Sequence, residues 1–403
     1  MINSIKKLGP GLLFAGAAIG VSHLVLSTKA GGDFGFGLVW ALIIINLIKY
    51  PFFEFAPRYT LSTGKSLLEG YKEIGKGILI VYFILNVLTM FTIQAAVTSV
   101  SAGIATKIFG FESNLLVSIG IALLCFTIII IGKFDFLDKT IKLFVFALCI
   151  CTIITAFVSL NNATEFNLNQ VFPVNNLELI FLVSFMGWMP GPLDISIWHS
   201  LWSLEKKKIN PELTFDNFRF DFNIGYLLTL IMGLVFISLG ATVLYNSGTN
   251  LSSSGSVFAA QLINLYTSSI GEKWFYVIAF GAFFTMLSTT IATLDASPRT
   301  MSLTSKILNF QFGRNQNFWL IILTLGTCLI FLFFSTEMGF LIKIATILSF
   351  ITAPLYAILN FILVTKKNMP KKYRPKKIIK IWSFLSIIFL LAFSFTYILT
   401  LFL

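Results

Sequence analysis

The sequence contains two histidines, His23 in the first long apolar segment and His199 in the sixth. An imidazole changes charge near neutral pH and is also a common metal ligand. Close to the second histidine, Met189 offers a thioether, which favours transition-type metal ions, and Asp194 offers a carboxylate. These residue types support ion binding or proton transfer. A histidine in an apolar helix is also often a packing residue, but the matched positions of these two favour a functional role.

Helix-breaking residues lie beside both histidines. Residues 190–192 read Pro-Gly-Pro; each proline removes a backbone donor, and the glycine lets the chain leave helical geometry. In the first segment Gly20 and Ser22 come just before the histidine. Backbone groups freed at half depth in a membrane are tolerated only where they line a cavity or are buried in protein. A simple proline kink is the alternative, but three consecutive breakers beside ionisable residues predict an interrupted helix.

The composition is that of a protein embedded in a lipid bilayer. Of the 403 residues 57% are hydrophobic and 11% charged, and the mean hydropathy is +0.88. A soluble protein carries roughly 25% charged residues. The net charge of +12 comes from basic residues in short loops, so it indicates no nucleic-acid partner. No loop combines a nucleophile, a base and an orienting group, so we expect neither an enzyme nor a cofactor.

Apolar runs of about 20 residues, the length that a helix needs to cross a bilayer, recur along the whole chain. We predict an all-α polytopic membrane protein with about eleven transmembrane helices. The predicted spans are 9–29, 34–57, 77–106, 113–132, 138–160, 178–203, 223–245, 273–295, 317–335, 338–365 and 379–403. Residues 255–270 are too polar to span and predict a short helix at the surface.

The basic residues predict the orientation. Most of the 29 lysines and arginines fall in loops on one side, which by the positive-inside rule is the cytoplasmic side. The N-terminus is then cytoplasmic and the C-terminus outside, and we expect the inner (plasma) membrane of a bacterium. Charged residues within spans have simple interpretations: Lys49 and Glu54 snorkel to the interface, and Asp295 pairs with Arg299 on one helix face.

The two candidate broken spans each begin a group of five. The chain is predicted to be one transporter domain, 1–403, with a first repeat at 9–160, a second at 178–365, and an additional span at 379–403. Inverted repeats with discontinuous first helices are a known transporter architecture, in which the ends of the half-helices bind the substrate.

Four short motifs resemble those of the Nramp family, which are proton-coupled divalent-metal transporters with a LeuT-type inverted repeat. The motifs are Gly9-Pro10-Gly11, Phe34-Gly35-Phe36, Met189-Pro190 and His199-Ser200. The resemblance implies that fold, with discontinuous helices 1 and 6, for the whole chain.

The binding motifs depart from the family pattern. Where the family has Asp-Pro-Gly-Asn in the first span, this sequence has Gly20-Val21-Ser22-His23, so the acidic ligand is a glycine. Where the family has Met-Pro-His-Asn in the sixth span, Met189-Pro190 is followed by Gly191-Pro192. The sequence therefore resembles a divergent branch, whose ion does not follow from the family alone.

The predicted site residues fall into two groups. The substrate or ion is expected to bind at Gly20, Ser22, His23, Met189, Gly191 and Asp194, with Met189, Asp194 and His23 as candidate metal ligands. The resemblance to LeuT-type transporters implies Ser288 and Thr289 as coupling-ion ligands, although such hydroxyls often only cap their own helix. His199 is the candidate proton relay.

Three functions are compatible with these patterns. The first is a secondary active transporter of a small inorganic ion, a divalent metal cation in particular, coupled to protons or sodium. Because the acid of the first span is absent, an anion such as a carboxylate or bicarbonate, or a small organic solute, is the alternative. The third is a membrane scaffold or sensor, which nothing in the sequence favours. The ion, the direction of transport and the oligomeric state stay open.

Overall fold

The computed structural model describes residues 9–132, 134–162, 168–245, 252, 255–334, 338–367 and 369–400. Every regular element within these residues is a helix, as predicted. Nine described helices are long and apolar enough to cross a membrane. They are α4 (Val39–Thr63), α6 (Lys76–Phe109), α7 (Asn114–Ile131), α8 (Phe134–Asn162), α11 (Phe215–Val243), α13 (Phe275–Ile307), α14 (Gln316–Phe334), α15 (Met338–Thr365) and α16 (Lys377–Thr400).

The two remaining spans are both interrupted, as predicted. The first consists of α2 (Pro10–Ala18), the wide turn η1 (Ser22–Ser27) and α3 (Thr28–Phe34), and it bends by 48° at its break. The sixth consists of the shorter apolar helix α9 (Asn176–Trp188) and of α10 (Ile195–Ile209). With these two, the helices of the described chain account for the eleven predicted spans.

Several helices extend beyond their predicted spans. The helix α13 continues to Ile307 and α11 begins at Phe215, in each case past the apolar segment and into polar residues. The helix α5 (Leu67–Ile74) was not predicted, and its first turn is held by a reciprocal pair of hydrogen bonds between Ser66 and Glu69. Two single turns, η2 (Glu272–Trp274) and η4 (Lys371–Tyr373), complete the described elements.

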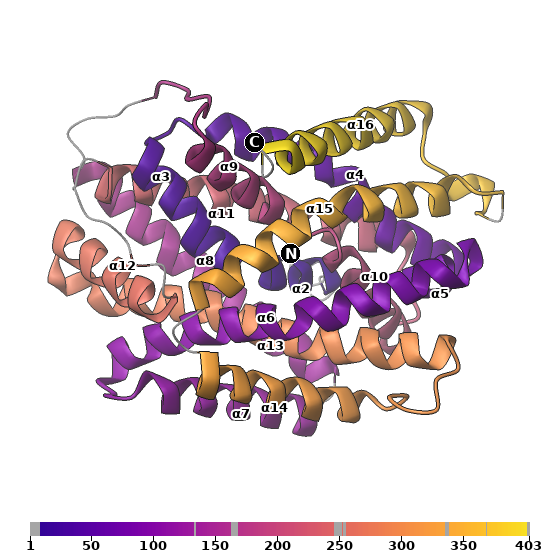
Figure 1. Ribbon diagram of the computed structural model, residues 1–403, viewed down its shortest axis with the longest axis horizontal. Coiled ribbons are helices and arrows are strands. Elements are labelled where there is room, and N and C mark those ends of the chain that lie inside the picture. The colour runs from indigo at the N-terminus through magenta and orange to yellow at the C-terminus, as the bar shows by residue number, and fades with distance from the viewer. Residues whose placement is uncertain are drawn as a thin grey trace.

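The short helix predicted at residues 255–270 is present as α12 (Gly255–Ile270), at one end of the bundle (Figure 1). It packs on α6 and buries Phe258 and Leu262. The hydroxyl groups of Tyr266 and of Thr28, in α3, lie 3.2 Å apart, so the helix also contacts the first span.

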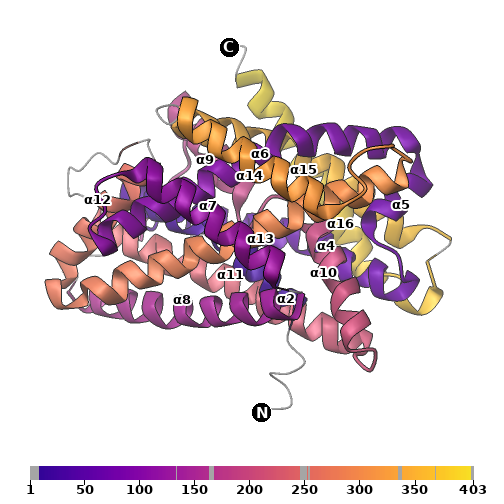
Figure 2. The same cartoon turned by 90° about the horizontal axis from the view of Figure 1, so that it is seen from below.

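The helices differ in how far they are enclosed. Most of α4 and α13 is buried, whereas α7 and α16 lie at opposite edges of the bundle and are mostly exposed (Figures 1 and 2). Exposed leucines and phenylalanines on the outer helices give the bundle an apolar exterior suited to lipid.

Glycines bring the two halves of the first span against α11. A methyl group on Gly11 of α2 would collide with the backbone of Asp221, and one on Gly225 would collide with the backbone of Gly11. The same relation holds between Gly31 of α3 and Gly240. Small residues allow such close backbone approach between membrane helices. Although the first span is broken, both of its halves therefore pack on the same helix, α11.

Candidate functional site

The first half of the first span is fixed at its start by a buried carboxylate. Asp221 of α11 accepts hydrogen bonds from the backbone N–H groups of Gly9, at 2.9 Å, and Gly11, at 2.7 Å. Four N–H groups at a helix N-terminus lack partners within the helix, and the helix dipole there favours negative charge. The Gly-Pro-Gly motif thus has two backbone N–H groups without partners in the helix, and the carboxylate of Asp221, from a distant segment of the chain, accepts from both.

The helix α2 ends at Ala18, and the chain leaves helical geometry at Ile19 and Gly20. A side chain on Gly20 would collide with Thr289 of α13, so glycine is required here by the approach of α13. The next residues form the wide turn η1, in which Ser22 donates to the carbonyl oxygen of Ala18 at 2.7 Å.

Hydroxyl groups from α13 satisfy the carbonyls freed by this break. The Oγ1 atom of Thr289 lies 2.9 Å from the carbonyl oxygen of Gly16 and 3.1 Å from that of Ile19. The Oγ atom of Ser288 lies 3.3 Å from the same carbonyl of Gly16. Both hydroxyls also approach the carbonyl of Thr285. These uncharged oxygen atoms are of the type that hard cations prefer.

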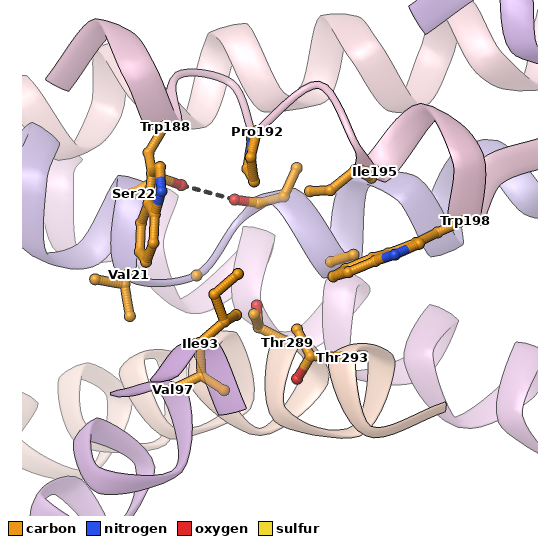
Figure 3. Close-up of a pocket in the computed structure, with 13 residues that line it drawn as sticks. Val21, Ser22, Ile93, Val97, Trp188, Pro192, Ile195, Trp198, Thr289 and Thr293 are labelled. Carbon is orange, nitrogen blue, oxygen red and sulfur yellow. Dashed lines mark hydrogen bonds between the residues drawn. The ribbon is translucent and has the colours of Figure 1, made fainter. Parts of the chain in front are cut away.

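A cavity of about 30 Å³ lies between the two breaks (Figure 3). This is enough for one water molecule or one unhydrated ion. Its lining comes from α2, the break that follows it, α6, the sixth span and α13. The lining residues are Ala17, Ala18, Gly20, Val21, Ser22, Ile93, Val97, Trp188, Pro192, Ile195, Trp198, Thr289 and Thr293. None of them is charged, and three of the predicted site residues, Gly20, Ser22 and Thr289, are among them.

The sixth span is interrupted over a longer stretch. The helix α9 ends at Trp188, the Met189–Pro190 peptide bond is cis, and α10 begins only at Ile195. The indole of Trp188 is held by a hydrogen bond to Ser349 at 3.1 Å, and it reaches the cavity from the end of α9.

The ammonium group of Lys49 lies at the end of α9. Its Nζ atom donates to the carbonyl oxygens of Met186 at 2.9 Å, Gly187 at 2.6 Å and Gly191 at 3.2 Å. The expectation that Lys49 snorkels to the interface is therefore wrong: its side chain is completely buried. The C-terminal end of a helix attracts a cation, and carbonyls left unpaired inside a membrane protein are costly. Together these two effects favour the buried position of the ammonium group over its hydration at the membrane–water interface.

Asp194 lies where α10 begins and is partly buried. One of its carboxylate oxygens, Oδ1, is buried without a hydrogen-bond partner, and the carboxylate interacts electrostatically with Lys49. The same carboxylate interacts electrostatically with three buried tyrosines, Tyr71, Tyr82 and Tyr356. Asp194 thus adds a negative charge near Lys49, but it does not line the cavity.

The two histidines occupy different environments. His23 is hydrogen-bonded through Nδ1 to the hydroxyl of Ser22, at 2.7 Å, and through Nε2 to the carbonyl oxygen of Thr229 in α11, at 3.0 Å. His199 is equally buried, but neither of its nitrogens has a hydrogen-bond partner among the described residues. Its ring stacks on Phe222 with centroids 5.5 Å apart, and Phe14 lies at 5.9 Å.

The three candidate metal ligands contact different neighbours. The sulfur of Met189 lies 3.8 Å from the hydroxyl of Ser27. The imidazole of His23 is hydrogen-bonded to the carbonyl oxygen of Thr229, and the carboxylate of Asp194 interacts electrostatically with Lys49. None of the three lines the cavity. Within the described ranges, no group of three or more His, Cys, Asp or Glu side chains is arranged to hold a metal ion.

Two charged residues have structural roles that the sequence did not predict: Lys49 binds the break of the sixth span, and Asp221 binds the start of the first. A charge within or at the edge of an apolar span signals a buried partner, and that signal was present for both. For Asp295 and Arg299 the pairing was predicted, and it is confirmed at 2.7 Å. Glu54, expected to snorkel, is instead buried and paired with Arg58.

The structural similarities are to transporters. A structure of a variant of the manganese transporter of Eremococcus coleocola aligns over 96% of this chain and 84% of its own, with a TM-score of 0.71 and 13% identity. A nucleobase-cation-symport-1 family transporter, in a closed conformation with bromovinylhydantoin bound, aligns over 98% and 91%, with a TM-score of 0.63 and 14% identity. At these identities the likeness shows the fold, which is the predicted LeuT-type fold.

The sequence similarities show the family. An uncharacterized protein of Pasteurella multocida strain Pm70 is 34% identical over 409 residues, covering 98% of this chain and 92% of that protein. The family model described as natural resistance-associated macrophage protein-like, or Nramp, matches residues 11–400. The chain therefore belongs to the Nramp family, as its motifs predicted, and is a membrane transporter rather than an enzyme.

Proposed function

We propose that this protein is a secondary active transporter of a small inorganic ion, a divalent metal cation in particular, and that the ion passes between the breaks of the first and sixth spans. The observation that carries the proposal is the cavity enclosed by these breaks and by Thr289 and Thr293 of α13. Membership of the Nramp family and the likeness to a manganese transporter support a metal as the ion.

The predicted residues have distinct parts in this function. Gly20 and Ser22 line the cavity, so they meet the ion first. Met189, Gly191, Asp194 and His23 do not line the cavity, so in this proposal they ligate the ion only after the breaks rearrange. Rocking or gating of one repeat against the other around a fixed site is how transporters of this fold open alternately to the two sides of a membrane.

The driving ion is a proton or sodium. His199, buried without a hydrogen-bond partner, is the proposed proton relay, since its nitrogens are free to accept a proton when water reaches them. Ser288 and Thr289, with the carbonyls of Gly16 and Ile19, are the proposed ligands of a coupling cation. In the described structure the two hydroxyl groups are hydrogen-bonded to these carbonyl oxygens.

The proposed placement in the membrane follows the basic residues. The N-terminus is cytoplasmic and the C-terminus outside, in the plasma membrane of a bacterium, and the similarity to a Pasteurella protein supports the bacterial setting. The proposed repeats, residues 9–160 and 178–365, each begin with a broken span, and residues 379–403 add a final one.

An anion or a small organic solute is the second candidate. Two observations favour it: no carboxylate lines the cavity, and Lys49 brings a positive charge to the sixth span. Against it, the three N–H donors of that ammonium group are already used by carbonyl oxygens, and the carboxylate of Asp194 interacts with the same charge. We therefore keep the metal cation as the first proposal.

Uptake into proteoliposomes tests the function. A metal-sensitive dye inside the vesicles should respond to a divalent cation added outside, faster under an inward proton or sodium gradient than without one. Gly20→Val should abolish the flux, because a side chain there collides with Thr289 and enters the cavity. Gly120→Val is the matched control, since no described residue lies within 4 Å of a Cβ atom added to that glycine on α7.

The outcome separates the two candidates. If no divalent cation crosses or competes under any gradient, the metal proposal fails. Thermal stabilisation of the purified protein by acetate or bicarbonate, and not by metals, then supports the anion.

A further inference from the structure

The three carbonyl oxygens of Met186, Gly187 and Gly191 form a carbonyl cradle at the break of the sixth span. All three point to one atom, the Nζ of Lys49, at 2.9, 2.6 and 3.2 Å. An ammonium group has three N–H donors, so the cradle uses the full hydrogen-bonding capacity of this side chain. The lysine is fully enclosed, and the carboxylate of Asp194 lies within its electrostatic range.

The cradle has the chemistry of a cation position. Carbonyl oxygens at the C-terminal end of an interrupted membrane helix carry the negative end of the helix dipole, and they coordinate monovalent cations in transporters. A nearby carboxylate adds a full negative charge. In this protein the position is already filled by a cation that is covalently part of α4.

We propose that Lys49 is a tethered cation, which takes the place of a free monovalent ion at the break of the sixth span. The cradle is complete without any ion from solution, so its stability does not depend on sodium or potassium. Lys49 also joins α9 to α4, the helix on which α10 packs, and thereby links the two halves of the sixth span through one charge.

A different role would give a different result. If Lys49 only filled space and anchored α4, its hydrocarbon chain and bulk would matter and its charge would not. A small external ammonium ion would then be unable to replace it. The two roles are separated by a variant that empties the cradle and by cations that do or do not fit into it.

The experiment uses Lys49→Ala in the full chain, purified in detergent. Its thermal unfolding midpoint is measured in methylammonium chloride and in tetramethylammonium chloride at equal concentration. Methylammonium has three N–H donors for the cradle, and tetramethylammonium has none. We expect methylammonium to raise the midpoint of the variant by about 2–4 °C at a tenfold excess over its dissociation constant. The wild type should respond equally to the two salts.

Lys343→Ala is the control variant, because Lys343 is an exposed lysine on α15. It should show no difference between the salts. The proposal is overturned if Lys49→Ala responds alike to both salts, or if the wild type gains as much from methylammonium as the variant does. Neither result depends on which ion the protein transports, so failure here is distinct from failure of the proposed function.

A variant that does not survive purification still gives an answer. Recovery of folded Lys49→Ala in methylammonium but not in tetramethylammonium supports the tethered cation. If neither salt allows recovery, Lys49→Gln decides, because its amide keeps hydrogen-bond donors and removes the charge. A midpoint of Lys49→Gln equal to that of the wild type overturns the proposal, and a midpoint lowered by more than about 4 °C supports it.

Discussion

The two broken spans satisfy the same need by different chemistry. At the break of the first span, the freed carbonyls of Gly16 and Ile19 share the single O–H donor of a neutral hydroxyl, Thr289. At the break of the sixth, the freed carbonyls accept from the ammonium of Lys49. A neutral hydroxyl is exchanged for an incoming ion at small electrostatic cost, whereas a tethered charge is not. The first break is therefore the better place for a mobile ion, and the sixth is the one with a fixed cation.

The spans also differ in what holds their halves. Both halves of the first rest on α11, through close backbone approach at Gly11 and Gly31. The halves of the sixth pack on different helices, α9 on α15 and α10 on α4. Breaking α11 contacts should thus disturb the whole first span, whereas the halves of the sixth are linked through Lys49 of α4.

The largest effect is expected from Gly225→Ala. The added methyl group would collide with the backbone of Gly11, which cannot rotate aside as a side chain can. Overpacking of this kind costs about 3 kcal/mol or more, and it moves α2 away from α11. We expect a much lower thermal unfolding midpoint, or loss of folded protein on size-exclusion chromatography.

Gly120→Ala provides the comparison for this change. No described residue lies within 4 Å of a Cβ atom added to that glycine, and alanine is the better helix former by about 0.5–1 kcal/mol, so this variant should be as stable as the wild type or slightly more stable. If both variants behave alike, close packing on α11 does not hold the first span.

A smaller effect is expected from Thr289→Val. Valine has nearly the shape of threonine but no hydroxyl, so the carbonyl of Ile19 loses its hydroxyl partner and that of Gly16 keeps only the longer contact with Ser288. The cost of leaving such groups buried and unpaired is about 1–3 kcal/mol. Thr289→Ser keeps the hydroxyl and should be close to wild type in thermal stability. Equal stability of the valine and serine variants would show that the hydroxyl does not support the first break.

The sequence predicts the features of the two broken spans that depend on neighbouring residues, and it does not predict the contacts between distant segments. The breaks at Gly20 and at residues 190–192 are properties of the local chain, and the prediction of both is confirmed. The contacts that complete them are not local. Lys49 and Gly187 are 138 positions apart, and Thr289 and Gly16 are 273 apart. A single sequence shows that a buried charge needs a partner, but only the packing of helices selects which one.

The smallest expected effect distinguishes the two histidines, one in each broken span. Replacing His23 by phenylalanine removes hydrogen bonds to Ser22 and to the carbonyl of Thr229, which should cost about 1–3 kcal/mol. The same replacement at His199 removes no hydrogen bond and puts a ring of similar shape against Phe222, so its cost should stay below about 1 kcal/mol.

Thermal midpoints of the two variants, with proton-driven uptake by each, test this difference. We expect His199→Phe to fold like the wild type, because no hydrogen bond is removed. The same variant should lose the stimulation of uptake by a proton gradient, because phenylalanine cannot carry a proton. His23→Phe should lose stability first. If His199→Phe proves the less stable of the two, the histidine of the sixth span has a structural role, and the proton relay must lie elsewhere.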